Sequence, residues 1–404
     1  MPLLVLFLLA LTLHASPYVD QRIAYAKEQI KKQKDRPQGY SDLAIALARR
    51  ARETGDPAYL KQAEDAINDS LRIAPANFEA RKARVIVRLQ QNRFADALEE
   101  AQALNKQIPD DNLTYGLIAD AQIALGNYRE AEKATQFMID MQQVNAPGIK
   151  RGADLRELFG FPEGANDWWN SALRITSAND TEERAWILTR MAHVQLRVGK
   201  KDVADKYLQQ AFSLDPNYPW ALTAMAMVRI AQERPAEAVD LLRKRLAQHE
   251  DLESSYQLAR ALEKSGRADD ARKAYDDFEK AALAASAQPA NANRDLILYL
   301  ADHDKAKDAV RIGREELARR HDALTLDAMA WALYRAGEFA EARKEIDKAI
   351  AVGIRDAGLF YHAGAIALKL DDPKAAKGFL KSSLEVDASS EESGAVLKAL
   401  AAIS

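Results

Sequence analysis

The chain has 404 residues, of which 48% are hydrophobic and 29% charged, and its formal net charge is -3. A protein that binds nucleic acid through phosphates usually carries an excess of Lys and Arg, so this charge balance argues against general nucleic-acid binding. Because the chain has no cysteine, disulfides, thiolate zinc sites, cysteine nucleophiles and a lipoprotein anchor are excluded.

The N-terminal segment begins with a short apolar run. Residues 3–13 are apolar, whereas crossing a bilayer requires about 20 such residues. The run fits the hydrophobic part of a secretory signal with Ala15 and Ser16 at the cleavage position, although no Lys or Arg precedes it. We expect residues 1–16 to be a signal peptide, with an uncleaved anchor or a mis-assigned start as alternatives. Residues 17–36 are predicted to form a helix that covers the first repeat.

A sixteen-residue pattern recurs along most of the remaining chain. It is clearest in residues 327–342, and it returns in eight segments that start at residues 82, 116, 150, 189, 223, 256, 294 and 361. Every segment ends in alanine, and the starts lie 33 or 34 residues apart except where residues are inserted after 150 and after 256. A period of about 34 residues is typical of stacked two-helix units. Each unit is predicted to contain a helix, a turn carrying Gly, Asn or Asp, and a second helix.

Small residues occupy the fourth place of the pattern in seven of these segments, and we expect them to face the closing alanine where the two helices approach. These residues are Ala119, Ala153, Ala192, Ala226, Ala259, Ala330 and Gly364. With Gly337 and Phe339 at a glycine and an aromatic turn position, the chain from about Tyr40 to Asp387 resembles the tetratricopeptide repeat family. The resemblance implies an all-α fold, a right-handed α-solenoid of about ten helix-turn-helix repeats. It also implies a non-enzymatic scaffold that binds another protein or an extended peptide.

Two irregular places divide the predicted array. A polar break at residues 177–181 separates an N-terminal repeat block, residues 37–176, from a C-terminal block, residues 182–388. The alanine-rich insertion at residues 281–293 is expected to lengthen the helix before it and to distort the superhelix, which can open a pocket. Residues 389–404 are predicted to form a capping helix in which Val396, Leu397 and Leu400 cover the last apolar face.

Three arginines lie on one side of a predicted helix in the N-terminal block. Arg81, Arg84 and Arg88 follow a spacing of three and four residues, which places them on one face. Guanidinium groups bind carboxylates and phosphates in bidentate fashion, so the set is a candidate anion-binding patch. The alternative is a structural set of ion pairs with Asp or Glu of the neighbouring helix.

The C-terminal repeats hold the strongest candidate for a ligand groove. The resemblance implies that first helices line the concave surface, with the first, fifth and eighth places of the pattern pointing into it. An acid, a cation and aromatic rings then converge, which is the composition of a recognition hot spot. The predicted groove contains Arg294, Asp327, Trp331, Tyr334, Tyr361 and His362. The alternative is that Trp331 is buried against the next helix and that Asp327 pairs with Arg294 or Arg355.

No sequence motif for catalysis is present. The chain lacks a Gly-rich phosphate loop, a Gly-x-Ser-x-Gly elbow and a His-Glu-x-x-His helix. The polar run Asp302, His303 and Asp304 with Asp308 favours a helix-capping turn over a metal site, because adjacent side chains diverge. We therefore expect no catalytic, cofactor-binding or metal residues, and no enzymatic activity.

The preferred hypothesis is a protein- or peptide-binding scaffold that is exported to the periplasm of the bacterial envelope, without a nucleic-acid partner and without an integral membrane span in the mature chain. Self-association as a structural component and an enzyme with its active site in the groove, near His193 or His362, are the alternatives. A cytoplasmic or N-terminally anchored protein is the alternative for location.

Overall fold

The computed structural model describes residues 17–142, 144–288 and 291–403, and within them the secondary structure consists of 22 α-helices. The predicted signal peptide, residues 1–16, lies outside the described residues. The helices alternate in ten pairs between α1 (Pro17–Lys32) and α22 (Ser393–Ala402). The first helices of the pairs are α2 (Pro37–Thr54), α4 (Phe78–Gln90), α6 (Asn112–Leu125), α8 (Ala146–Leu158), α10 (Thr181–Arg197), α12 (Pro219–Ala231), α14 (Leu252–Lys264), α16 (Arg294–Asp302), α18 (Ala323–Arg335) and α20 (Ala357–Lys369). The second helices are α3 (Ala58–Ile73), α5 (Phe94–Gln107), α7 (Tyr128–Met141), α9 (Pro162–Ile175), α11 (Lys201–Leu214), α13 (Pro235–Leu246), α15 (Ala268–Ala285), α17 (Ala306–Leu317), α19 (Phe339–Ala351) and α21 (Pro373–Val386).

The predicted turns and small residues explain this alternation. Positive φ angles occur at the turn residues Gly126, Gly160, Gly199, Gly266 and Gly337, and at Asn92. The alanines in the fourth place and the closing alanines are all at most 3% exposed. At Gly364 a Cβ atom would lie 2.6 Å from the Cδ2 atom of Leu380, so no larger residue fits without displacement. The close helix pairing predicted from the repeat is therefore confirmed.

Asp and Asn residues cap most first helices. In α4, α6, α8, α10, α14, α18 and α20, the capping side chain accepts a hydrogen bond from a backbone N–H of the first turn. Such caps satisfy donors that have no partner inside the helix and stabilise it by roughly 1 kcal/mol each. Helix α10 begins at Thr181, as expected, and Asp180 is its cap.

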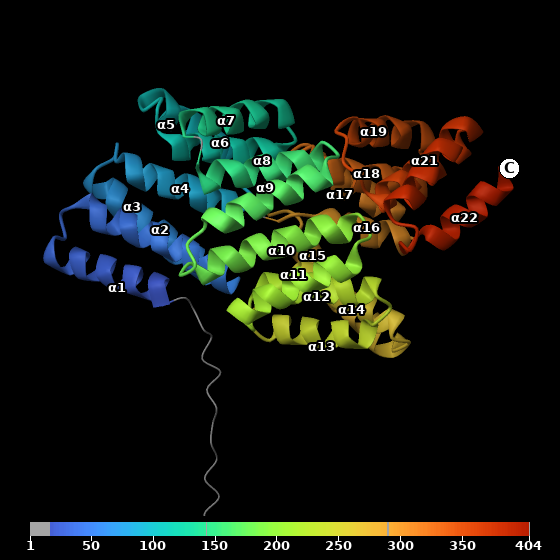
Figure 1. Cartoon of the computed structure of the whole chain (residues 1–404), viewed down its shortest axis with the longest axis horizontal. Coiled ribbons are helices and arrows are strands. Elements are labelled where there is room, and N and C mark those ends of the chain that lie inside the picture. The colour runs from blue at the N-terminus through green and yellow to red at the C-terminus, as the bar shows by residue number, and fades with distance from the viewer. Residues whose placement is uncertain (1–16, 143, 289–290, 404) are drawn as a thin grey trace, which may run out of the picture.

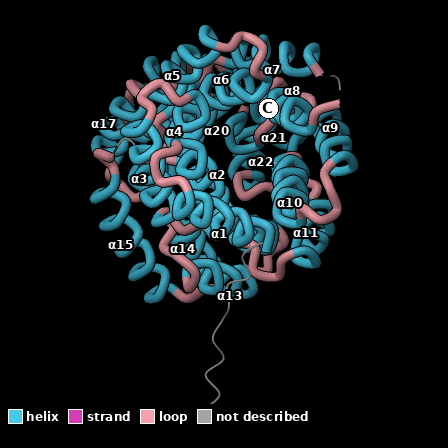
Figure 2. The backbone as a smooth tube through the Cα atoms, turned by 90° about the vertical axis from the view of Figure 1, so that its left-hand side faces the viewer, coloured by secondary structure: helices cyan, strands magenta, loops and turns pink. Residues whose placement is uncertain are grey.

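The helix pairs wind around a common axis (Figure 1). Figure 2, at right angles to that view, shows first helices such as α2, α4, α6 and α10 nearer the axis and second helices such as α5, α9, α13 and α17 at the rim. We call the surface of the first helices that faces the axis the inner surface. The architecture is the all-α solenoid that the repeat predicts.

Successive turns of the superhelix touch each other. The backbone N–H of His321 donates to the carbonyl of Leu125 at 3.2 Å, and the backbone N–H of Ala323 donates to the Tyr128 hydroxyl at 2.9 Å. Farther along the same seam, Trp220 Nε1 donates to the Arg52 carbonyl at 2.8 Å. Since these partners are about 170 to 195 residues apart, the seam locks the first turn against the second.

The two ends of the array are covered differently. Helix α1, which lies within the predicted N-terminal segment at residues 17–36, packs on α2 and buries Val19 and Ala26. At the other end α22 buries Val396, but Leu397 is 58% exposed. The prediction that Leu397 covers the last apolar face is therefore wrong, because consecutive helical residues point about 100° apart and only one face of α22 meets the array.

A continuous core crosses the polar break at residues 177–181. One buried cluster runs from Ala153 on α8 to Val228 on α12 and includes residues on both sides of the break. None of the helices in the described ranges is both long and apolar enough to cross a membrane.

Candidate functional site

Four of the predicted groove residues form one aromatic cluster on α18 and α20. The Trp331 ring is stacked between Tyr334, at 4.8 Å between centroids, and His362, at 4.1 Å, while Tyr361 lies tilted at 5.8 Å. Trp331 is 7% exposed, and its Nε1 donates to Asp302 at 2.9 Å. Tyr334 and Tyr361 are half-buried, so their outer edges face solvent while Trp331 supports them from beneath.

Asp327 joins the same cluster through His362. It is 4% exposed, and its Oδ1 lies 2.8 Å from His362 Nδ1. Burial alone would lower the pKa of His362, but the nearby Asp327 carboxylate outweighs it and the pKa is raised. Asp327 thus pairs with His362 and not with Arg294 or Arg355. The structure brings together five of the six predicted groove residues, and their role in ligand binding stays a prediction.

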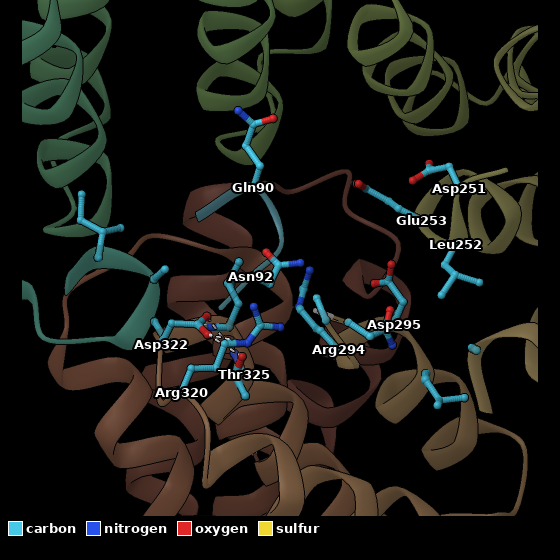
Figure 3. Close-up of a pocket in the computed structure, with 18 of the residues that line it drawn as sticks. Gln90, Asn92, Asp251, Leu252, Glu253, Arg294, Asp295, Arg320, Asp322 and Thr325 are labelled. Atoms are coloured by element: carbon cyan, nitrogen blue, oxygen red, sulfur yellow. Dashed lines mark hydrogen bonds and ion pairs between the residues drawn. The ribbon is translucent and has the colours of Figure 1, made fainter. Parts of the chain in front are cut away.

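Arg294, the sixth predicted residue, lines a separate cavity of about 770 Å³ (Figure 3). The cavity lies on the seam between turns, with Gln90 and Asn92 at the end of α4 on one side and the starts of α14, α16 and α18 on the other. It adjoins the insertion at residues 281–293, where α15 is extended to Ala285 and where Asn291 and Ala292 line the wall. A pocket thus lies beside the insertion, while the distortion of the superhelix stays a prediction.

Apart from the exposed Glu250, three charged side chains in the cavity have no hydrogen bond or ion pair among the described residues. They are Arg294, whose buried Nε lacks an acceptor, and the carboxylates Glu253 and Asp295. The Glu253 side chain lines the cavity and is exposed to solvent; the protein packed around it and the like charge of Asp295 and Asp251 raise its pKa. The pKa of Asp295 is raised by burial, which withdraws water from its carboxylate.

Glu253 and Asp295 were not predicted as site residues. Asp295 directly follows the predicted Arg294, and Glu253 lies three residues before the start of its repeat pattern at residue 256. Both residues lie outside the first, fifth and eighth places of the pattern, at helix starts that meet only at the seam between turns.

The three predicted arginines of α4 converge on one carboxylate. Glu100 of α5 accepts from Arg81 Nε at 3.1 Å, from Arg84 Nε at 2.7 Å and from Arg88 Nη1 at 2.7 Å. Glu100 is 6% exposed, so the carboxylate is enclosed by the guanidinium groups. This is the arrangement of the structural alternative; an anion would have to compete with Glu100 for these donors.

An ionic chain crosses the inner surface near His193. Arg190 donates to Asp154 at 2.6 Å, and Arg197 donates to Glu157 and to Asp356, each at 2.9 Å. Burial and the adjacent Arg190 lower the pKa of His193 to about 4, so the imidazole is neutral near pH 7. Arg197 and Asp356 belong to different turns, and the pair therefore adds a charged contact to the seam.

Comparison with known proteins places this geometry in a family. Residues 187–218 match a tetratricopeptide repeat family model, whereas no curated protein matches the sequence. A structure of the human IFIT1 dimer with m7Gppp-AAAA is similar at a TM-score of 0.55 and 15% identity, covering 83% of this chain and 76% of that one. The Cut9-Hcn1 assembly of the APC/C has a TM-score of 0.48 at 13% identity, and this chain, 95% of which is covered, spans only 59% of its length.

A third similar structure is yeast Tom70, with a TM-score of 0.41 and 16% identity over 96% of this chain and 92% of that chain. At these identities the IFIT1 likeness shows a shared fold. Residues 187–218 thus match a tetratricopeptide repeat, and the 34-residue period and the paired helices closed by buried alanines continue the same arrangement along the described array.

Proposed function

We propose that the chain is a non-enzymatic scaffold that binds another protein or an extended peptide on its inner surface. Tetratricopeptide solenoids form extended concave surfaces suited to such binding. The observation that carries the proposal is the aromatic cluster, in which Tyr334 and Tyr361 present half-buried rings over a fixed Trp331. Because these rings are already held by stacking, a ligand would order few side chains on binding, and the entropic cost would be small.

The chemistry of the inner surface favours peptide over nucleic acid as the ligand. IFIT1, whose TM-score is the highest of the three structures described above, is seen with m7Gppp-AAAA. In this chain the seam cavity is lined by five acidic and two basic side chains, and the net charge of the whole chain is -3. This balance would repel phosphates, so the proposal excludes nucleic acid as the partner.

Export to the periplasm of a bacterial envelope is part of the same proposal. Its support is the sequence alone, namely the apolar run at residues 3–13 followed by Ala15 and Ser16. N-terminal sequencing of the mature chain tests it: a chain that begins at residue 17 is expected, and a chain that retains residues 1–16 would contradict it.

Selection from a random peptide library tests the binding function. Peptides enriched by the purified wild-type chain are synthesised and titrated against wild type, Tyr361→Ala and Tyr25→Ala. Tyr25 is 64% exposed on α1, away from the cluster, and is the matched control. We expect at least about tenfold weaker binding to Tyr361→Ala, which corresponds to about 1.4 kcal/mol, and unchanged binding to Tyr25→Ala. Equal binding to all three proteins, or no enriched peptide, would overturn the proposal.

Self-association is the second candidate function, and one observation favours it. Apolar side chains are exposed around α6 and α7, including Leu113 (40%), Phe137 (41%), Met141 (40%) and Val144 (69%). Exposed apolar surface of this kind marks interaction sites when it is contiguous. Light scattering of wild type and Phe137→Ser distinguishes the two: a concentration-dependent dimer that Phe137→Ser abolishes would favour self-association, and a monomer at all concentrations would exclude it.

A further inference from the structure

The seam cavity differs from the rest of the inner surface in how its charges are satisfied. Several arginines of the inner surface have carboxylate partners, as in the pairs of Arg190 with Asp154 and Arg197 with Asp356. In the cavity Arg294, Glu253 and Asp295 have none among the residues that the structure describes. Glu253 is exposed, whereas Arg294 and Asp295 are partly buried. Partly buried charges without partners are costly, so those of Arg294 and Asp295 point to a ligand that supplies the missing partners.

The sign of the uncompensated charge is negative. Of the two arginines, Arg320 forms an ion pair with Glu316, with 2.7 Å between Nε and Oε1, so its charge is neutralised. Asp322 caps α18 and accepts from Thr325, so its charge is also engaged. Among the groups without partners, the single guanidinium of Arg294 stands against the two carboxylates of Glu253 and Asp295, so the charge that is left over is negative. A cationic group is therefore the complementary ligand.

The cation that fits is organic and not a metal ion. No set of three or more His, Asp or Glu side chains in the described part of the chain is close enough to hold a metal ion. Phe278 and Leu296, both 2% exposed, provide an apolar wall beside the charges. A volume near 770 Å³ lies within the range of about 300–1,000 Å³ for cavities that bind organic ligands.

We propose that the cavity binds a lysine or arginine side chain of a peptide segment, with the cationic group between Glu253 and Asp295 and with Arg294 donating to a carbonyl oxygen of the same segment. The methylene groups of that side chain lie along the apolar wall. Figure 3 shows Arg294 near the centre of the cavity, with Glu253, Asp295 and Asp251 together on one side of it. This inference rests on the proposed peptide-binding function and names the chemistry of the bound segment.

Binding of a cation in this place depends on pH. The charged groups around Glu253 are Arg245 from α13, Glu250 and Asp251 just before α14, Arg294 and Asp295 from α16, and Arg320 and Asp322 between α17 and α18. Because the pKa of Glu253 is raised above that of an ordinary glutamate, its carboxyl changes from the protonated to the ionised form over a pH interval that is shifted upward. A cation favours the ionised form, so affinity rises with pH across this interval and a proton is released on binding.

The test uses two blocked peptides, acetyl-Gly-Ala-Lys-Ala-Gly-amide and the same peptide with Gln in place of Lys, titrated by calorimetry into the full chain. We expect the Lys peptide to bind at least about tenfold more tightly than the Gln peptide at pH 8. Glu253→Gln and Asp295→Asn should each remove most of this preference. Arg294→Gln should weaken both peptides and leave their ratio unchanged, and Glu99→Gln on α5 should behave as wild type.

Equal binding of the two peptides to wild type would overturn the inference, and so would an unchanged preference in Glu253→Gln and Asp295→Asn. The comparison of peptides on wild type needs no variant, so it decides the matter even where a substitution prevents folding. If the library yields peptides whose binding is weakened by Tyr361→Ala, but the chain binds the Lys and Gln peptides equally, only the assignment of the cavity fails. If neither experiment finds a bound peptide, the proposed function itself fails.

Discussion

Replacing Glu100 with glutamine tests whether the arginine cluster of α4 stabilises the N-terminal repeats. The carboxylate accepts hydrogen bonds from Arg81, Arg84 and Arg88, and its side chain is only 6% exposed. Glutamine keeps the size of the side chain. It removes the negative charge, however, and puts an N–H₂ donor where one accepting oxygen faces the guanidinium groups.

The loss of stability expected for Glu100→Gln follows from the burial and the charge of the groups involved. Breaking a buried ion pair by removing one partner costs about 3–5 kcal/mol. The three arginine side chains are 22% to 36% exposed, so water screens part of the resulting repulsion. We therefore expect the free energy of unfolding of this region to fall by about 2–4 kcal/mol. Arg84→Gln should cost less, about 1 kcal/mol, because Arg81 and Arg88 still neutralise the carboxylate.

The contribution of Glu100 to the stability of the fold depends on pH. Burial alone would raise the pKa of Glu100, but the hydrogen bonds from Arg84 and Arg81 outweigh it and the pKa is lowered. A carboxyl with a lowered pKa in the folded state stabilises the protein above its ordinary pKa, about 4.3, and the stabilisation is lost as pH falls from there through the folded-state value. The difference between wild type and Glu100→Gln should therefore be largest near neutral pH and disappear in acid.

Hydrogen exchange measured by mass spectrometry is the assay, because stability in a solenoid is local to its units and is read out segment by segment. Peptides from α4 and α5 should exchange faster in Glu100→Gln, while those from α18 and α20 should be unchanged. Glu99→Gln is the matched control, since Glu99 is the exposed neighbour on the same helix. Equal protection of α4 and α5 in the two variants would refute the structural role of the cluster.

Three further predictions concern the seam and the aromatic cluster. Gly126→Ala should lower the thermal midpoint more than Gly337→Ala: both residues have positive φ, but only at Gly126 would the new Cβ meet a backbone carbonyl of the next turn, at 2.5 Å. Equal shifts would show that the seam contributes nothing to stability there. Trp331→Ala should cost about 3–5 kcal/mol in urea unfolding, and a loss below about 1 kcal/mol would contradict its buried position. The raised pKa of His362 means that its pair with Asp327 stabilises the fold fully below the ordinary histidine pKa and is lost as pH rises through the folded-state value. Thermal midpoints should therefore fall across that interval in wild type and not in Asp327→Asn, and parallel pH profiles would refute the pairing.

The repeat pattern predicted the helix pairs because their determinants are local. Turn residues such as Gly160 and Gly199 and small residues such as Ala153 act within one unit, so a single sequence reveals them. The insertion at residues 281–293 is also visible in the sequence, and the cavity lies beside it.

The seam between turns had no signal in the sequence. It depends on small rotations that accumulate over several units, so the contact of Tyr128 with Ala323 cannot be read from either residue. The partner of Asp327 was missed for a simpler reason. His362 lies one repeat farther along, on the adjacent first helix, and only places one, five and eight were compared.

The most direct test of the central claim is to map where a bound peptide lies. A library-selected peptide carrying a photoreactive group is crosslinked to the full chain, and the attached residues are identified by mass spectrometry, with excess unlabelled peptide as competitor. The account predicts competed attachment to the inner first helices α14, α16, α18 and α20. Competed attachment confined to rim helices such as α7 or α13 would contradict binding on the inner surface.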